Sequence, residues 1–235
     1  LAGIMTKTGH IGYVAANPVY GVPAAINAFA QGLKSVRPAG RIWLRWACQT
    51  DAAHPLDFAD CQEIDMVYGR DSREPADTNR DYGLCRKLPD GSLQPLGLPI
   101  WRWDTFYVQI VRSIFDGSWD NAATTRAVNY WWGLRSGAED LEYQEALPSG
   151  TRQLLDLMET LQGSDNVHIF PEKLYDNENN LRSPENRIYS PKELMEMDWL
   201  GECVEGSLPR YDQLDVRTLG LLEINGLSSL KETTL

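Results

Sequence analysis

The alternation of an apolar strand, an amphipathic helix and a second apolar strand within residues 10–46 constrains the fold more than any other feature of the chain. HIGYVAA (10–16) is a short apolar run typical of a buried strand, and apolar residues recur at helical spacing over 22–33. RIWLRW (41–46) then supplies the second strand. Because a strand–helix–strand unit makes a right-handed crossover between parallel strands, the sequence predicts an α/β fold with a parallel sheet flanked by helices.

The next segments extend the sheet and then change its character. IDMVYG (64–69) indicates a third strand, and the residues before it have room only for a short helix that begins near Pro55. Residues 82–99 alternate about an Asp90-Gly91 turn, which predicts a β-hairpin in place of a further strand–helix repeat. The α/β order is therefore interrupted after the third strand.

The remaining segments are predicted mainly as helices joined by turns. Helical periodicity covers residues 103–115, where Asp116-Gly117 stops it, and another helix is expected over 151–161. Ser190-Pro191-Lys192-Glu193 is a capping-box pattern for a helix running into MDWL (197–200). The other predicted elements are a strand at HIF (168–170), a polar turn at DNENN (176–180) and an extended arm over 206–235.

Charge and hydropathy argue against two classes of partner. The chain carries a formal charge of −11, with 14 Lys+Arg against 13 Asp+Glu in residues 1–137 and 8 against 20 in residues 138–235. An acidic second half repels phosphate backbones, and the sequence has no cluster of cations for nucleic acid to bind. No run approaches the roughly 20 apolar residues that span a bilayer, so we expect this chain itself to be soluble.

Signatures of metal binding and catalysis are missing from the sequence. The four cysteines (Cys48, Cys61, Cys85 and Cys203) form no CxxC pair, and the three histidines are too scattered to complete a zinc site. We therefore expect buried free thiols and neither a metal nor a cofactor. No GxGxxG, GxxxxGK[ST], GxSxG or HExxH pattern occurs, so the sequence favours a noncatalytic binder.

The eight tryptophans of the chain suggest the kind of ligand that such a protein would bind. Ligands of open α/β sheets bind outside the carboxyl ends of the strands, and aromatic rings there offer flat surfaces for planar or cyclic solutes. Trp46 ends a predicted strand, and Trp101 and Trp103 lie where a linker enters a helix, so these three are candidates for stacking. Core positions are expected for Trp43, Trp119, Trp131 and Trp199.

Six sequence blocks occur in the order, and with nearly the spacings, of one protein family. The most specific is GYVAANP followed by INAFAQGLKSVRP, and the last ends in MDWLGECVEGSLP. Across most of residues 3–209 the chain resembles the basic membrane protein (BMP) family of solute-binding lipoproteins, which includes purine nucleoside receptors. The resemblance implies a periplasmic-binding-protein-like type I fold, in which two α/β lobes close about a hinge on a solute delivered to the membrane subunits of an ABC importer.

The resemblance also implies how the chain is divided. It places residues 1–97 and about 126–209 in the second lobe, 98–125 in the hinge crossing with a first-lobe helix, and 210–235 in a C-terminal arm. Most of the first lobe, together with a lipid-anchored and extracytoplasmic beginning, would lie upstream of Leu1. We therefore expect half of the solute cleft to be absent from these 235 residues, and the face left by the missing lobe to favour self-association.

Solute contacts are expected in the loops that follow the parallel strands and where the chain crosses back to the first lobe. The residues assigned by the resemblance and by the position of the strand ends are Asn17, Pro18, Val22, Trp46, Gln49, Tyr68, Gly69, Arg70, Trp101 and Trp103. Family members usually place an aromatic residue at the position of Asn17 and another near Gln49. The implied solute is a nucleoside or a similar small polar cyclic molecule.

Two alternatives to a transport receptor stay open. The first is a BMP-like sensor, regulatory or interaction module fused to an upstream domain, which a signal peptide with a lipobox would exclude. The second is an enzyme acting on nucleosides or sugars through Asp71 or Asp104 beside aromatic rings. Turnover assays with a panel of nucleosides distinguish the enzyme from the binder.

Overall fold

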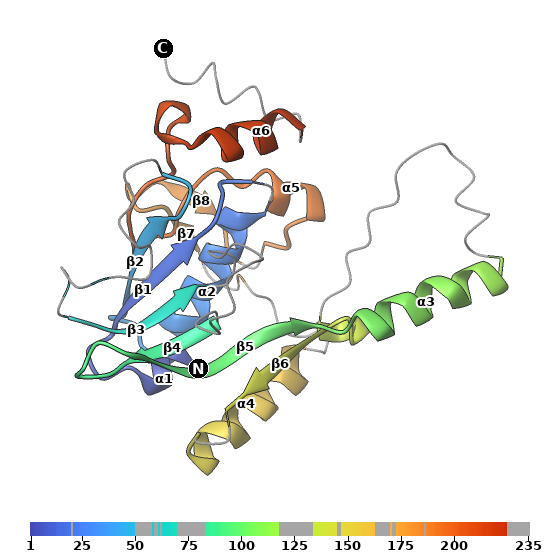
Figure 1. Cartoon of the computed structure of the whole chain (residues 1–235), viewed down its shortest axis with the longest axis horizontal. Helices are drawn as coiled ribbons and strands as arrows, with labels where there is room; N and C mark the ends of the chain where they lie inside the picture. The colour runs from blue at the N-terminus through green and yellow to red at the C-terminus, as the bar shows by residue number, and fades with distance from the viewer. Residues whose placement is uncertain are drawn as a thin grey trace. The chain divides into compact units, whose positions relative to one another are not determined.

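The computed structural model describes most of the chain. The described residues are 1–19, 21–49, 58, 61, 63–69, 83–117, 134–144, 147–162, 170, 173–185 and 187–224. They belong to two compact units, one formed by Leu1–Leu96 with His168–Leu235 and the other by Gly97–Val167. The first unit contains the parallel strands of the sheet (Figure 1).

The predicted strand–helix–strand unit is confirmed as β1 (His10–Ala15), α2 (Val22–Val36) and β2 (Arg41–Trp46). β1 and β2 pair in parallel over all six positions. The predicted third strand is β3 (Ile64–Gly69), which pairs in parallel with the other side of β1. Five of the six residues of β1 are buried, as expected for a central parallel strand covered on both faces.

The complete sheet has the strand order β6-β5-β4-β3-β1-β2-β9. β9 (Val204–Glu205) adds a parallel strand beside β2, whereas β4 (Gly83–Lys87) is antiparallel to β3. β4 continues into β5 (Leu93–Trp101) through a turn in which the Gly91 N–H donates to the Leu88 carbonyl. The predicted hairpin is therefore confirmed, and the fold is a mixed α/β sheet flanked by helices, consistent with the periplasmic-binding-protein-like type.

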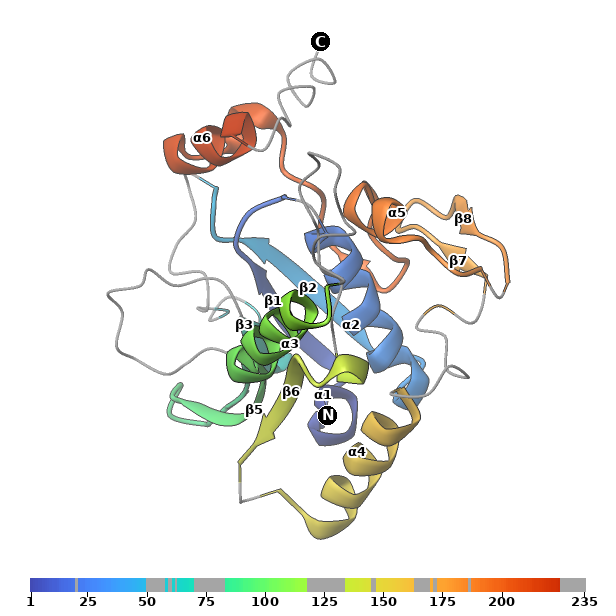
Figure 2. The same cartoon turned by 90° about the vertical axis from the view of Figure 1, so that its right-hand side faces the viewer.

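Side chains of β1 alternate between two packed faces of the sheet. α2 covers one face, where the ring centroids of Tyr13 and Phe29 lie 5.2 Å apart (Figure 2). Val14 faces the other way and belongs to a buried cluster with Phe58. Gly12 shares this second face, and a Cβ atom there would lie 2.6 Å from the Phe58 ring. Glycine at position 12 therefore makes room for Phe58.

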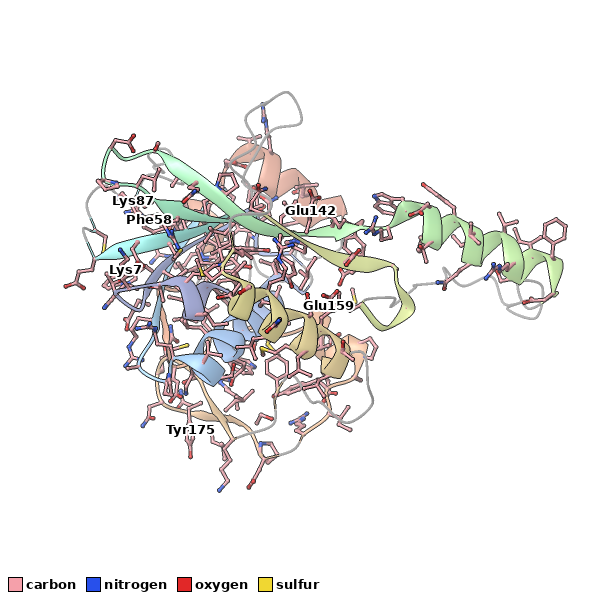
Figure 3. All side chains as sticks on the ribbon, turned by 90° about the horizontal axis from the view of Figure 1, so that it is seen from below. Lys7, Phe58, Lys87, Glu142, Glu159 and Tyr175 are labelled. Atoms are coloured by element: carbon pink, nitrogen blue, oxygen red, sulfur yellow. The ribbon has the colours of Figure 1, made fainter. Side chains whose placement is uncertain are left out.

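Phe58 is held from two further directions. The Lys87 ammonium group donates to the Phe58 carbonyl at 3.2 Å, and both residues are labelled in Figure 3. The Arg45 guanidinium carbon lies 4.3 Å from the centroid of the ring, a cation–π geometry. Phe58 is consequently 2% exposed. The short helix predicted near Pro55 lies outside the described residues.

The chain enters the sheet from a short helix, α1 (Ala2–Met5). Asp65 of β3 fixes the connection, because its carboxylate accepts hydrogen bonds from the Thr6 hydroxyl at 2.5 Å and the Lys7 N–H at 2.6 Å. Among the described residues, no helix is long and apolar enough to cross a membrane. Most of the strand predicted at 168–170 lies outside the described residues.

The predicted polar turn lies between β7 (Leu174–Tyr175) and β8 (Leu181–Ser183), which pair as an antiparallel ribbon. Buried Asp176 organises the turn, since its carboxylate accepts from the Asn180 N–H at 2.8 Å and from the Arg182 guanidinium at 2.6 Å. Burial alone would raise the pKa of Asp176, but these hydrogen bonds outweigh it and lower the pKa to about 2. The carboxylate is therefore ionised at neutral pH.

The predicted capping box begins α5 (Pro191–Met195). The Ser190 hydroxyl accepts from the Glu193 N–H, and the Glu193 carboxylate accepts from the Ser190 N–H at 2.8 Å. The predicted continuation into MDWL (197–200) is wrong, because the helix ends at Met195.

Tertiary hydrogen bonds to Asn27 replace helical ones in the MDWL segment. Asn27, on α2, donates to the Trp199 carbonyl at 2.9 Å and accepts from the Gly201 N–H at 2.7 Å. Met197 and Leu200 are buried at 6% and 3% exposure. The segment therefore packs onto α2 as an irregular strap that leads into β9.

The predicted extended arm is also wrong for the residues that the structure describes. This stretch contains a 3₁₀ turn, η3 (Tyr211–Gln213), and the helix α6 (Val216–Ile224). Leu214, just before α6, and Thr218 and Leu222 within it are at most 5% exposed, so one side of this stretch is buried inside the first unit.

The second unit contains the predicted helices α3 (Trp103–Phe115) and α4 (Ser149–Gln162), which are confirmed. Between them lie η2 (Leu134–Ser136) and β6 (Glu139–Tyr143), and β6 pairs antiparallel with the end of β5. α3 has no buried residue. It is attached to η2 by the Gln109 amide, which donates to the Ser136 carbonyl. The second unit therefore exposes most of a helix that the sequence makes apolar on one side.

Candidate functional site

The carboxyl ends of β1, β2 and β3 meet at one edge of the sheet. Ala15 at the end of β1 lies opposite Trp46 of β2, and Val14 lies opposite Gly69 of β3. The loops that carry most of the expected solute contacts therefore leave the sheet together. Arg70, which follows β3, lies outside the described residues.

A C-terminal segment, residues 207–224, covers this edge at the ends of β1 and β2 (Figure 1). The Trp46 indole N–H donates to the Ser207 carbonyl at 2.9 Å. Gln49 forms an isolated antiparallel bridge with Leu214. Two of the expected contact residues therefore make bonds to the segment that the sequence predicts as an extended arm.

The same segment reaches the ends of β1 and β2 through polar groups of its helix start. The Asp215 N–H donates to the Cys48 carbonyl at 2.8 Å, and the Asp215 carboxylate accepts from the Thr218 N–H at 2.7 Å. The Thr218 hydroxyl, on a residue that is 1% exposed, donates to Asn17 Oδ1 at 2.6 Å. α6 is thus fastened to both strand ends by hydrogen bonds.

The thiol beneath this contact is not a reactive one. Cys48 is 2% exposed, and burial raises the pKa of its thiol to about 11. The remaining cysteines, Cys61, Cys85 and Cys203, are also thiols, and the last two are buried. The neutral Cys48 thiol is therefore a packing group between β2 and α6.

Two of the expected stacking surfaces are used in packing. Tyr68 is 9% exposed, and its ring lies 4.9 Å from Tyr13 and 5.0 Å from Phe29 between centroids. Trp46 is 2% exposed. Gly69 is buried as well, so the ends of β2 and β3 present little aromatic surface at this edge.

Four of the expected residues stay partly accessible at this edge: Asn17, Pro18, Val22 and Gln49. Asn17 and Pro18 leave β1, and Val22 begins α2 after Gly21, whose φ of +77° suits glycine at a helix start. The edge therefore offers two carboxamide side chains beside small apolar surfaces, a composition suited to a polar uncharged ligand.

Trp101 and Trp103 form an open aromatic surface in the second unit. They are 47% and 54% exposed, and their rings stack with centroids 5.9 Å apart and an interplanar angle of 29°. Tyr107 extends the surface, with its centroid 6.2 Å from that of Trp103. Rings in this arrangement can stack against a base or the apolar face of a sugar.

An acidic cluster in the second unit shows pKa values shifted in opposite directions. Burial raises the pKa of Glu159, and the nearby Asp140 charge adds to the effect. A hydrogen bond from the Arg102 guanidinium lowers the pKa of Asp140. Burial also raises the pKa of Tyr143 to about 12. The lowered pKa of Asp140 is thus that of an ion pair with Arg102, whereas the raised pKa values of Glu159 and Tyr143 come first from burial.

Within the part of the chain that the structure describes, no group of three His, Cys, Asp or Glu side chains could hold a metal ion. The enzyme alternative names Asp104, which is an exposed residue in the first turn of α3, and Asp71, which lies outside the described residues.

Sequence reasoning missed the residues that the C-terminal segment brings to the edge, Thr218 above all. A signal was present, because Asp215 is a favourable N-cap residue and is followed by helically spaced apolar residues. Reading that pattern would have predicted α6, though not the strand ends that it contacts.

Comparison with known proteins gives two similar sequences, and no protein-family model matches the chain. The chain is 29% identical over 153 residues to the Haloferax volcanii protein named "Putative ABC transporter glucose-binding protein TsgA13", which covers 60% of this chain and 37% of that protein. It is 24% identical over 226 residues to "Purine-binding protein BAB2_0673" of Brucella abortus, which covers 89% of this chain and 61% of that protein. The chain spans less than two thirds of the length of either relative, and both are named as binding proteins.

Proposed function

We propose that the chain is part of the solute-binding component of an ABC importer and that its solute is a nucleoside or a similar small polar cyclic molecule. The observation that carries the proposal is its similarity to two proteins named for binding glucose and purine, together with a mixed α/β sheet of the matching kind. Both named ligands are cyclic and rich in hydrogen-bonding groups. Solute would stabilise a closed state by hinge closure, and the membrane subunits of the importer would recognise that state.

The proposal assigns different kinds of contact to two surfaces. In the first unit, Asn17 and Gln49 supply carboxamides for hydrogen bonds, beside Pro18 and Val22. In the second unit, the exposed rings near Trp101 supply stacking. An extracytoplasmic, lipid-anchored location for the full-length protein belongs to the same proposal, as do Tyr68, Gly69 and Arg70 as residues near the solute.

The proposal is tested by calorimetry on the full-length protein with adenosine, inosine, guanosine and glucose as probes. Trp101→Ala or Trp103→Ala should weaken binding of a nucleoside by about 1–3 kcal/mol, the range for loss of one base–aromatic stack. Phe115→Ala is the matched control, because Phe115 is an 87% exposed aromatic at the opposite end of α3. Absence of binding to all four probes would reject the proposed function.

A second candidate function is an interaction module, and the exposed apolar side of α3 favours it. Tyr107, Val111 and Ile114 are 60%, 49% and 52% exposed, which is unusual for apolar residues that share one helical face. This candidate predicts self-association that depends on concentration and is weakened by Tyr107→Lys. Light scattering that shows a monomer at all concentrations would count against it.

A further inference from the structure

Asn17 is an expected contact residue whose side chain is held by a hydrogen bond from the C-terminal segment. Its backbone carbonyl accepts from the Val19 N–H at 2.8 Å, and its side-chain Oδ1 accepts from the Thr218 hydroxyl at 2.6 Å. The side chain is only partly buried, whereas Thr218 is 1% exposed. A buried hydroxyl therefore holds a carboxamide that is itself accessible at the edge of the sheet.

The direction of this hydrogen bond determines what the carboxamide can offer. When Oδ1 accepts from Thr218, both N–H groups of Nδ2 remain available as donors, and no hydrogen bond among the described residues uses them. Thr218 cannot easily move away, because the Asp215 carboxylate caps its N–H and Leu222 of the same helix is fully buried. The geometry thus presents Asn17 Nδ2 as an oriented donor.

We propose that Thr218 is a positioning residue of the solute site, which holds Asn17 so that Nδ2 donates to a hydrogen-bond acceptor of the solute. The acceptor would be a carbonyl oxygen of the solute, such as the one on the base edge of inosine. The inference rests on the proposed function and deepens it, since it assigns the C-terminal helix a part in selecting the solute.

The orienting bond matters because an amide group can present either a donor or an acceptor to its ligand. Without the Thr218 hydroxyl, rotation about the last side-chain bond of Asn17 exchanges Oδ1 and Nδ2 at the same position. When the Thr218 hydroxyl is present, Asn17 faces the solute with its Nδ2 donor. A solute group that is also a donor then has no acceptor at this position and loses a hydrogen bond on binding. Thr218 therefore acts on selectivity as well as on affinity.

The test compares Thr218→Val, which removes the hydroxyl from a side chain of similar shape, with Thr218→Ser, which keeps it. Calorimetry on the full-length protein uses inosine, whose base edge carries a carbonyl acceptor, and adenosine, which carries an amino donor at the same position. Thr218→Val should weaken inosine binding about 5- to 30-fold and lower the ratio of inosine to adenosine affinity, whereas Thr218→Ser should stay within about 3-fold of wild type.

A second variant keeps the test independent of folding defects in α6. Asn17→Asp keeps an oxygen for the Thr218 hydroxyl but has no Nδ2, so it should fold with an unchanged melting temperature and bind inosine at least about 10-fold more weakly. A merely structural role for Thr218 would lower the melting temperature of Thr218→Val and reduce both affinities equally.

The outcomes separate this inference from the proposed function. Nucleoside binding that is unaffected by Thr218→Val and Asn17→Asp would overturn the inference and leave the proposed function standing. Equal losses for both nucleosides would also overturn it. If the wild-type protein binds neither nucleoside nor glucose, the proposed function and the inference fall together.

Discussion

Replacement of Asn27 by alanine should be among the most destabilising single changes in the first unit. The side chain is 1% exposed and joins α2 to a segment 174 positions away, donating to the Trp199 carbonyl and accepting from the Gly201 N–H. Asn27→Ala leaves both backbone groups without this partner. Since each buried polar group left unsatisfied costs about 1–3 kcal/mol, we expect a loss of roughly 3 kcal/mol in the free energy of unfolding.

The measurement is urea-induced unfolding followed by circular dichroism, with extrapolation to zero denaturant. Gln31→Ala is the matched control, because Gln31 lies one turn further along α2 and makes no hydrogen bond among the described residues; it should change stability by less than about 0.5 kcal/mol. A loss below about 1 kcal/mol for Asn27→Ala would refute the reasoning, since it would mean that the two backbone groups find other partners.

Asn27→Asp adds a pH signature to this prediction. The aspartate keeps an acceptor for Gly201 but has no N–H for Trp199, and burial should raise its pKa above the unfolded value of about 3.9. A raised pKa in the folded state means that stability is lost as pH rises from the unfolded value through the raised folded value. The variant should therefore lie closer to wild type at pH 3 to 4 than at pH 7, and a constant difference across this range would contradict burial of the charge.

Three further predictions concern other elements of the first unit, and the same urea titrations check them. Gly12→Ala should lower the free energy of unfolding by about 1–3 kcal/mol, because its Cβ atom would lie 2.6 Å from the Phe58 ring. Gly32→Ala, with open space around it, should raise the free energy of unfolding by up to about 1 kcal/mol. Similar effects of the two substitutions would contradict this reasoning. Ionised Asp176 stabilises the wild-type protein above pH 3.8, and this stability is lost as pH falls toward the folded pKa of about 2. Asp176→Asn should therefore be less stable than wild type at neutral pH, and the free energies of unfolding of the two proteins should converge at low pH. A difference that stays constant with pH would count against a lowered pKa. Ser190→Ala should cost about 1 kcal/mol through loss of the helix cap, and no change would mean that α5 is held by packing alone.

The elements that the sequence predicts correctly are those whose residues show a local pattern of hydrophobic spacing or a turn motif. β1, α2 and β2 follow from apolar runs and helical spacing, and the β4–β5 hairpin follows from its Asp90-Gly91 turn. The error at MDWL has a different origin. Local propensity favours a continued helix there, but Asn27 supplies hydrogen bonds from a distant part of the chain, and no local pattern reports them.

In the candidate site as well, local patterns predict the positions of residues along the chain but not the distant contacts that their side chains make. The strand ends place Asn17 and Gln49 at the carboxyl edge of the sheet, and that expectation needs only the rule for parallel strands. Whether an aromatic ring at a strand end faces a ligand or the core depends on what packs over it. Trp46 and Tyr68 are buried because Ser207 and the rings of α2 and β1 occupy their polar and apolar surfaces.

The pairing of β9 with β2 has a consequence for how the chain folds as it is made. β2 ends at Trp46, but its outer partner begins at Val204, so its hydrogen-bonding edge stays open while the intervening residues are translated. At about 5–20 residues per second, the 174 positions between Asn27 and Gly201 correspond to roughly 10 to 35 s. During that interval the apolar side of α2 and the edge of β2 lack their final neighbours, and completion of the first unit waits until residues 199–205 have been made.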